Sequence, residues 1–361
     1  MNIDQLLADL AAGRIAALAR AISVVENGRP GFEELLGGVH PRLGRARRIG
    51  LTGPPGAGKS TLVERLVGAW RGQGLRVAVV AVDPTSPFTG GALLGDRIRM
   101  ESVALDENVY IRSMATRGSL GGVATTTREV CDVLDAAGFD RIVVETVGVG
   151  QSELDVAGTA DTTVLVLVPE SGDGIQTLKS GVMEIADVFV VNKADRPGAE
   201  KLRQEIEVTL GIRAGNAFRH VRAHHGRAVG TVKTVGTVKT VGTVRTVEAV
   251  GKGGGARDQV AEVPVILTVA AKGEGIDELV AALEAQHARL EASGMLAERR
   301  RKRLLQRTRE VVERATRRWV WEETGAERYI LERMDDIVAG RASPYDVAAQ
   351  LVDGLKQGER V

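Results

Sequence analysis

A glycine-rich run at positions 53–61, GPPGAGKST, contains the residue types that phosphate chemistry requires. Its glycines allow a loop to turn its N–H groups inward around phosphate oxygens. Lys59 can direct a positive charge at the β and γ phosphates, and Ser60 can offer a hydroxyl to Mg²⁺. An apolar run precedes the loop and a helix-like stretch follows it, as a P-loop requires and a ligand-free glycine turn does not. We therefore expect a nucleoside triphosphate to be bound by Gly53, Pro54, Pro55, Gly56, Ala57, Gly58, Lys59, Ser60 and Thr61.

A second pattern, Asn192-Lys193-Ala194-Asp195, follows the apolar run 188–191 and has the form NKxD. In such a loop the Asp195 carboxylate accepts N–H bonds from guanine, Asn192 supports the loop, and the Lys193 stem covers the base. Adenine presents an acceptor to that carboxylate, and sites built on such bonds can discriminate by about 10⁴-fold. A surface turn is the alternative. The position of the pattern at the end of an apolar strand, after a P-loop, favours GTP and GDP as ligands.

Three acidic residues lie at or near the ends of apolar runs, where open α/β sheets bind ligands. Asp83 follows the run 76–82, Asp96 lies in GGALLGDRIRM, and Glu145 begins an ExxG sequence in place of the usual DxxG. Mg²⁺ prefers oxygen ligands and keeps waters, so one or two carboxylates suffice beside a hydroxyl and phosphate oxygens. Each acid alone could merely solubilise a strand end. Together they predict a metal set of Ser60, Asp83, Asp96 and Glu145, and a catalytic set of Lys59, Asp83 and Glu145.

The residue that would position the attacking water is not evident from the sequence. Gly148 is followed by Val149 and Gly150, so Gln151 does not stand directly after the ExxG glycine. Water positioning must come from elsewhere in the chain, for which Asp83 is one candidate, or from a partner. Because phosphoryl transfer depends on positioning and charge neutralisation, we expect slow intrinsic turnover that rises when a partner binds.

The turn expected to contact the purine follows an apolar strand predicted over 263–269. GTPases often place a serine in this turn, whereas here the residues are Ala270, Ala271 and Lys272, followed by glycine. A main-chain N–H can still donate to guanine O6. We therefore keep these three residues in the predicted base-binding set.

The elements that position these residues predict an α/β P-loop NTPase fold with a mostly parallel sheet flanked by helices. The 361 residues accommodate one large domain with appendages. We expect a helical extension over 1–46, the P-loop domain over 47–290 with a low-complexity insertion at about 226–258, and a helical arm over 291–361. Lys plus Arg (48) nearly cancel Asp plus Glu (47), which favours neither nucleic acid nor a membrane as partner. The single cysteine, Cys131, suits a reducing cytoplasm.

Three further features lie in the appendages and the insertion. The repeat TVKTVG at 231–248 fits neither helix nor strand periodicity, so an extended insertion is expected rather than a basic tether. His220 and His224 have helical spacing that could suit a metal, but a polar loop is the simpler interpretation. The stretch 295–323 predicts a long helix with one apolar stripe that needs a cover, and its basic run 299–303 is expected to be a solvated face.

The longer strings resemble the MeaB/ArgK-type P-loop GTPases, which include the human MMAA protein. The resemblance rests on GPPGAGKST, VDPTSP, GALLGDRIRM, RGSLGGVATTTRE, ETVGVGQSE and the run SGDGIQTLKSGVMEIADVFVVNKAD, and covers about two thirds of the chain. It implies a GTPase chaperone that gates adenosylcobalamin loading and protects methylmalonyl-CoA mutase or a related acyl-CoA mutase. It also implies a homodimer formed through the C-terminal arm, a first switch at Asp83 and Asp96, a second at Glu145, and a third at Ser171 to Lys179.

Other functions remain open at this point. An ATP- or GTP-dependent kinase or transport accessory is one, although NKxD argues against ATP. A nickel-insertion GTPase is another, although such proteins usually carry a His-rich or Cys-bearing metal site. A third is a scaffold that binds nucleotide without hydrolysing it.

Overall fold

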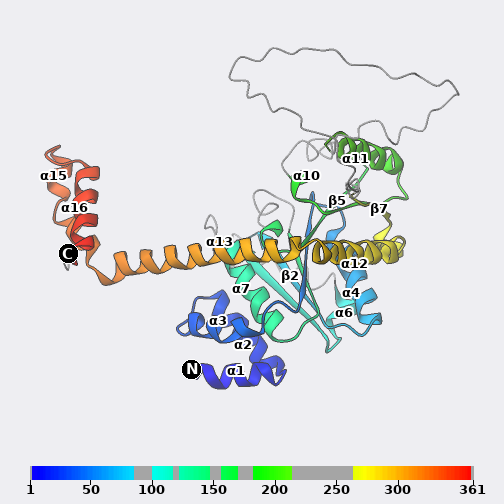
Figure 1. Cartoon of the computed structure of the whole chain (residues 1–361), viewed down its shortest axis with the longest axis horizontal. Coiled ribbons are helices and arrows are strands. Elements are labelled where there is room, and N and C mark those ends of the chain that lie inside the picture. The colour runs from blue at the N-terminus through cyan, green and yellow to red at the C-terminus, as the bar shows by residue number, and fades with distance from the viewer. Residues whose placement is uncertain are drawn as a thin grey trace, which may run out of the picture.

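The computed structural model describes residues 2–84, 100–116, 122–146, 156–169, 182–213 and 263–358. Its centre is a seven-stranded sheet in the order β3-β2-β4-β1-β5-β6-β7, with every pair of neighbours parallel (Figure 1). The strands are β1 (Arg47–Thr52), β2 (Val77–Pro84), β3 (Val109–Thr116), β4 (Arg141–Thr146), β5 (Thr162–Leu167), β6 (Val188–Asn192) and β7 (Val265–Thr268). The predicted α/β architecture with a parallel sheet is confirmed.

Helices cover both faces of the sheet, which is why its strands are nearly continuous apolar runs. Successive residues of β2 point to opposite layers, so Val79 joins the core on one face and Val80 the core on the other. The first face carries α4 (Lys59–Gly72), α6 (Glu101–Ala104) and α12 (Ile276–Ala292). The second carries α7 (Gly122–Ala136), with α10 (Val182–Ile185) and α11 (Ala199–Arg213) over β5 and β6.

The N-terminal helices form an additional layer outside α7 (Figure 1). They are α1 (Ile3–Ala11), α2 (Ile15–Glu26) and α3 (Phe32–Val39), followed by the 3-10 turn η1 (His40–Arg42). Their apolar faces are buried, with Leu10, Ile22 and Leu35 almost wholly excluded from solvent. The first 46 residues therefore share the core of the P-loop domain.

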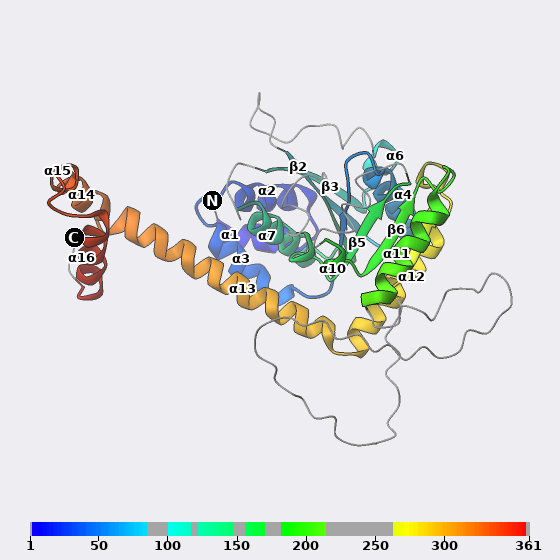
Figure 2. The same cartoon turned by 90° about the horizontal axis from the view of Figure 1, so that it is seen from above.

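The C-terminal arm begins with α13 (Met295–Arg318), which continues into a π-helical turn, η3 (Trp319–Glu323). Figures 1 and 2 show α13 running along the body and carrying three short helices away from it. These are α14 (Ala326–Leu331), α15 (Met334–Val338) and α16 (Pro344–Lys356). Within the described ranges, no helix is both long enough and apolar enough to cross a bilayer.

The basic run at the start of α13 is not the solvated face expected from the sequence. Arg299 donates to both carboxylate oxygens of Asp187, at 2.8 and 2.9 Å. Arg300 donates to Asp161 at 2.8 Å, and Arg303 contacts the same carboxylate. Because a buried carboxylate needs a cation to offset its desolvation, these arginines anchor α13 to the domain.

Candidate nucleotide-binding site

The glycine-rich loop lies between β1 and α4, as predicted, and its backbone has no room for larger residues at two positions. Gly53 has φ 143°, and a Cβ there would lie 2.1 Å from the carbonyl oxygen of Val166 on β5. Gly58 has φ 85°, and its Cβ would lie 2.4 Å from Nδ2 of Asn192. The loop therefore fits closely against the neighbouring strand and against the predicted base-recognition loop.

Lys59 is the first residue of α4, and its side chain turns back over the loop. It is only 6% exposed, and its Nζ donates to the carbonyl oxygens of Gly53 at 2.7 Å and Pro54 at 3.0 Å. These bonds fix the ammonium beside the loop, next to the N–H groups at the start of α4. Such a helix start attracts anions, because its N–H groups and its dipole are both positive there.

Ser60 and Glu145 meet beside the loop, although 85 residues separate them. The Ser60 hydroxyl donates to Glu145 Oε1 at 2.7 Å, and Glu145 is 5% exposed. The contact follows from the pairing of β1 with β4, in which Leu51 is the register partner of Glu145. Hydroxyl and carboxylate oxygens next to a phosphate loop are ligands that suit Mg²⁺.

The other two predicted metal ligands are Asp83 and Asp96. Asp83 lies in β2, two residues past Ala81, the register partner of Glu145, so its backbone is at the carboxyl edge of the same sheet. Asp96 lies outside the described residues. No group of three or more His, Cys, Asp and Glu side chains suited to a metal occurs in the described part of the chain.

Asn192 is the hydrogen-bonding centre of the predicted base-recognition loop. Its Nδ2 donates to the carbonyl of Ala57 in the phosphate loop at 2.8 Å. Its Oδ1 accepts from the Thr268 hydroxyl and the Ala270 N–H, both at 3.1 Å. One buried amide therefore connects the phosphate loop, the NKxD loop and the turn after β7.

Sequence patterns did not identify Thr268 as part of this site. It lies 76 residues after Asn192, and only the pairing of β6 with β7 makes the two register partners. Its side chain is buried, as is that of Asn192. A threonine at the end of an apolar run carries no local indication of such a partner.

The remaining NKxD residues line the outer side of the site. Lys193 has φ 57°, and no other non-glycine residue in the described ranges has a positive φ. A left-handed lysine is strained, and such strain often marks functional positions. The Asp195 carboxylate is partly exposed and lies 3.3 Å from Nζ of Lys272. The structure thus brings together the predicted base-binding residues from the two loops.

The turn after β7 is a 3-10 turn, η2 (Ala270–Lys272). The Ala270 N–H is bonded to Asn192, and the Lys272 N–H donates to the Val269 carbonyl at 2.9 Å. The Ala271 N–H forms no hydrogen bond with any residue that the structure describes. The predicted main-chain donor to guanine O6 could therefore be this N–H group, which no described residue occupies.

Several predicted segments lie outside the described residues. These are the stretch with Asp96, the stretch with Gln151, the third-switch segment Ser171 to Lys179, and the insertion with His220, His224 and the TVKTVG repeat. Their expected roles remain predictions.

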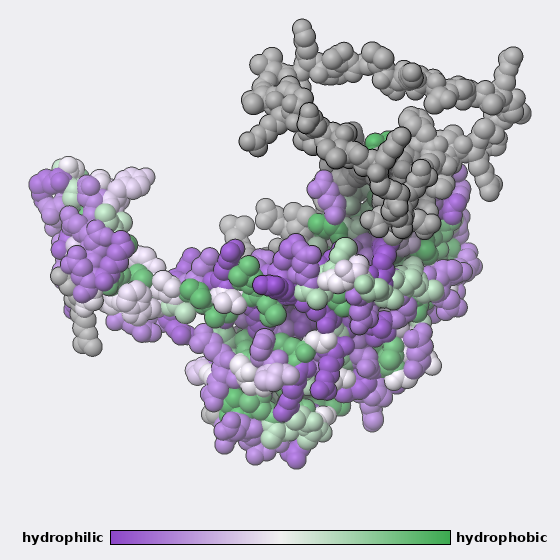
Figure 3. Space-filling model, in the orientation of Figure 1, coloured by the Kyte–Doolittle hydropathy of each residue, from purple (hydrophilic) through white to green (hydrophobic). Residues whose placement is uncertain are grey.

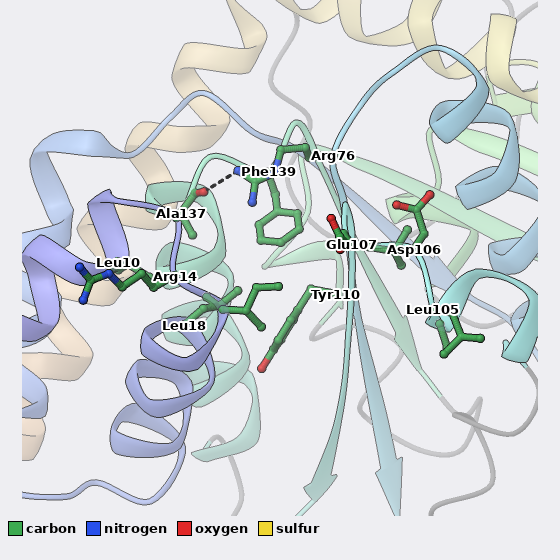
Figure 4. Close-up of a pocket in the computed structure, with 14 residues that line it drawn as sticks. Leu10, Arg14, Leu18, Arg76, Leu105, Asp106, Glu107, Tyr110, Ala137 and Phe139 are labelled. Atoms are coloured by element: carbon green, nitrogen blue, oxygen red, sulfur yellow. Dashed lines mark hydrogen bonds between the residues drawn. The ribbon is translucent and has the colours of Figure 1, made fainter.

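A cavity of about 310 Å³ lies at the other edge of the sheet, between the N-terminal helices and β3 (Figure 4). Leu18, Tyr110 and Phe139 line it, and Arg76 donates to the Ala137 carbonyl at 2.9 Å beside it. Arg76 directly precedes β2 and Val109 is the first residue of β3, so the cavity lies at the amino ends of the strands. The phosphate loop follows the last residue of β1 and lies at their carboxyl ends. This cavity is therefore separate from the candidate nucleotide site.

Comparisons with known proteins agree with this geometry. A family model described as methylmalonyl-CoA mutase-associated GTPase MeaB matches residues 18–325. A Pyrococcus abyssi protein named as a GTPase is 44% identical over 310 residues, covering 86% of this chain and 84% of the relative. The mouse methylmalonic aciduria type A homolog, mitochondrial, is 42% identical over 207 residues, covering 54% of this chain and 50% of that protein. The crystal structure of a LAO/AO transport system kinase matches with TM-score 0.63 and 26% identity, covering 99% of both chains.

Proposed function

Because the chain belongs to the MeaB family of methylmalonyl-CoA mutase-associated GTPases, we propose that it is a GTP-hydrolysing chaperone of an acyl-CoA mutase. In this proposal it gates the loading of adenosylcobalamin into methylmalonyl-CoA mutase or a related enzyme and protects that enzyme from inactivation. The family's association with methylmalonyl-CoA mutase and the mouse relative support the choice of client.

The bond from Asn192 to the Ala57 carbonyl is the observation on which the nucleotide assignment depends most. It connects a loop suited to phosphates with a loop suited to guanine, so that one nucleotide can span both. Lys59 then contacts the β and γ phosphates, Asp195 accepts from the guanine N–H groups, and the Ala271 N–H donates to O6. Each interaction uses a group that the fold already orients.

The bound nucleotide carries Mg²⁺ in this proposal, held by the Ser60 hydroxyl with Glu145 beside it. Asp83 and Asp96 complete the set. When bound, the ion neutralises charge that develops on the phosphate oxygens. The Ser60 hydroxyl and the Glu145 carboxylate already lie together, which supports this assignment.

Hydrolysis by the isolated chain is slow in this proposal, because no glutamine directly follows the ExxG glycine. Client binding then accelerates it by ordering the switches around the γ-phosphate. A nucleotide can shift the switches only by the difference in its contacts with each state, so GTP and GDP must contact them differently.

Exposed apolar residues on the C-terminal arm support the proposal of a homodimer. Leu304, Leu305, Val311 and Val312 on α13 are between 36% and 57% exposed. Figure 3 shows hydrophobic side chains among hydrophilic ones along this arm. A second copy would remove that apolar surface from water, and each square ångström buried contributes about 25 cal/mol. A monomeric mass in light scattering at micromolar concentration would rule out this part of the proposal.

Phosphate release, measured with and without purified methylmalonyl-CoA mutase, tests the proposed function. We expect the mutase to raise the rate of GTP hydrolysis and Lys59→Ala to abolish it. Rapid hydrolysis that no acyl-CoA mutase changes would remove the chaperone role and leave only a GTPase. No phosphate release under any condition would instead favour a nucleotide-binding scaffold.

The name of the LAO/AO transport system kinase makes a transport-associated kinase the second candidate. That function would use ATP as phosphate donor, which conflicts with the expected pairing of Asp195 with guanine. Competition between ATP and GTP for the site distinguishes the two.

A further inference from the structure

Arg65, on α4, donates two hydrogen bonds to η2, the turn after β7 that is predicted to contact the purine. Arg65 belongs to neither the P-loop motif nor the NKxD motif. Its Nε donates to the Ala270 carbonyl at 3.0 Å, and its Nη2 donates to the Ala271 carbonyl at 2.9 Å. The planar guanidinium presents donors in a fixed fork, which suits two neighbouring carbonyl oxygens. A lysine in its place could not match both with the same geometry.

Asn192 and Arg65 together hold the backbone of Ala270 and Ala271 in this turn. Asn192 accepts from the Ala270 N–H, so residue 270 is held at both its N–H and its carbonyl. Residue 271 is held only at its carbonyl, by Arg65, while its N–H has no acceptor among the described residues. Because the Ala270 carbonyl and the Ala271 N–H belong to one planar peptide unit, the bond from Arg65 to the Ala270 carbonyl also fixes the direction of the Ala271 N–H.

Arg65 also has a special position along the chain. It lies on the helix that begins with Lys59 and Ser60, so one rigid element carries both the phosphate-binding residues and a support of the purine turn. The turn lacks the serine that GTPases often place there. The guanidinium provides a support from outside the turn.

We propose that Arg65 is a positioning residue for guanine specificity, which aims the Ala271 N–H at the O6 oxygen of a 6-oxopurine by holding the carbonyls of Ala270 and Ala271. This inference rests on the proposed function, because it requires that the site binds guanine. It assigns no contact between Arg65 and the nucleotide itself.

Binding of three diphosphates to wild type and Arg65→Ala, measured by calorimetry in Mg²⁺, tests the inference. GDP has all the guanine groups, IDP lacks the 2-amino group but keeps O6, and 6-thio-GDP replaces O6 with a weaker sulfur acceptor. We expect the substitution to weaken GDP and IDP equally, by about tenfold, because two charge-assisted bonds are lost. It should weaken 6-thio-GDP at most about twofold, because the O6 bond is already impaired.

Equal weakening of all three diphosphates would show a general loosening of the site and overturn the inference, as would no weakening of any. Arg65→Lys provides a second variant that keeps the charge. We expect it to weaken GDP and IDP more than 6-thio-GDP, as Arg65→Ala does, but with a smaller loss of affinity. If Arg65→Ala does not fold, the lysine variant decides by the same criterion.

Arg71→Ala is the matched control. Arg71 lies at the other end of α4, where it donates to Asp106 and to the Leu75 carbonyl, both at 2.7 Å. We expect its removal to leave the affinities for all three diphosphates unchanged. If the wild type does not prefer GDP over ADP, the proposed function is refuted. If the wild type prefers GDP but Arg65→Ala binds all the diphosphates with wild-type affinity, only this inference is refuted.

Discussion

Asn192 on β6 donates its side-chain N–H to the carbonyl of Ala57 in the phosphate loop at 2.8 Å, across 135 residues of sequence. This bond couples the two ends of the candidate site: neither loop can shift without affecting the other. The consequences of that coupling can be measured.

Replacement of Asn192 by alanine removes three buried hydrogen bonds, to Ala57, Thr268 and Ala270. Each contributes about 1 kcal/mol, so GDP and GTP should both dissociate about 100-fold faster. Stopped-flow release of a fluorescent GDP analogue measures this. Asn27→Ala, at the exposed end of α2, should release the analogue at the wild-type rate. Loss of GTP binding with normal GDP binding would show that Asn192 does not link the loops.

Substitution of Gly53 by alanine should prevent nucleotide binding and destabilise the fold. Its Cβ would lie 2.1 Å from the Val166 carbonyl, and φ 143° is strained for any L-residue. We expect a loss of about 3 kcal/mol in the free energy of unfolding. Urea unfolding and a GDP titration measure both effects. Gly68→Ala, in the interior of α4 with open space around it, should instead stabilise slightly.

The substitution Glu145→Gln keeps an oxygen that can accept from the Ser60 hydroxyl but removes the charge. We expect nucleotide affinity in EDTA to stay near that of wild type, and the gain in affinity on adding Mg²⁺ to fall about tenfold. GDP titrations with and without Mg²⁺ give that ratio directly. An unchanged Mg²⁺ effect would remove Glu145 from the metal set.

Asp161 anchors the arm, and its titration should be visible in stability. Burial alone would raise the pKa of Asp161, but the hydrogen bond from Arg300 and the charge of Arg303 outweigh it, so the pKa lies below its ordinary value. Because the folded-state pKa is the lower one, this stabilisation is complete above about pH 4 and is lost as the pH falls further.

Replacement of Asp161 by asparagine leaves the partly buried Arg300 and Arg303 without a charge partner, so it should lower the free energy of unfolding by about 3 kcal/mol near pH 7. The difference in the free energy of unfolding between wild type and variant should become smaller as the pH is lowered below 4. Urea midpoints between pH 7 and pH 3 test this, with Asp353→Asn, in an exposed pair with Lys356, as control. A gap that stays constant with pH would contradict the account of Asp161.

Local patterns predicted much of this molecule. The P-loop, NKxD and the apolar strand runs are each contained in fewer than ten consecutive residues, so their spacing is visible in the sequence. The parallel sheet then places both loops at one edge, as expected for ligand sites of open α/β folds.

The contacts that the sequence did not predict join residues far apart. Arg300 and Asp161 are 139 residues apart, and the arginine run looks like an ordinary solvated helix face until the fold places carboxylates beneath it. Thr268 and Arg65 join the site only through strand register and helix packing. Neither periodicity nor composition carries that information.

The most direct test is calorimetric titration of the pure, folded chain in Mg²⁺ with GTP and with ATP, repeated for Asp195→Asn with XTP. We predict that wild type binds GTP and discriminates strongly against ATP, and that the variant prefers XTP, whose 2-oxo group accepts from the new amide. Equal binding of ATP and GTP, or binding of neither, would contradict the assignment of Lys59 and Asp195 to the two ends of one guanine nucleotide.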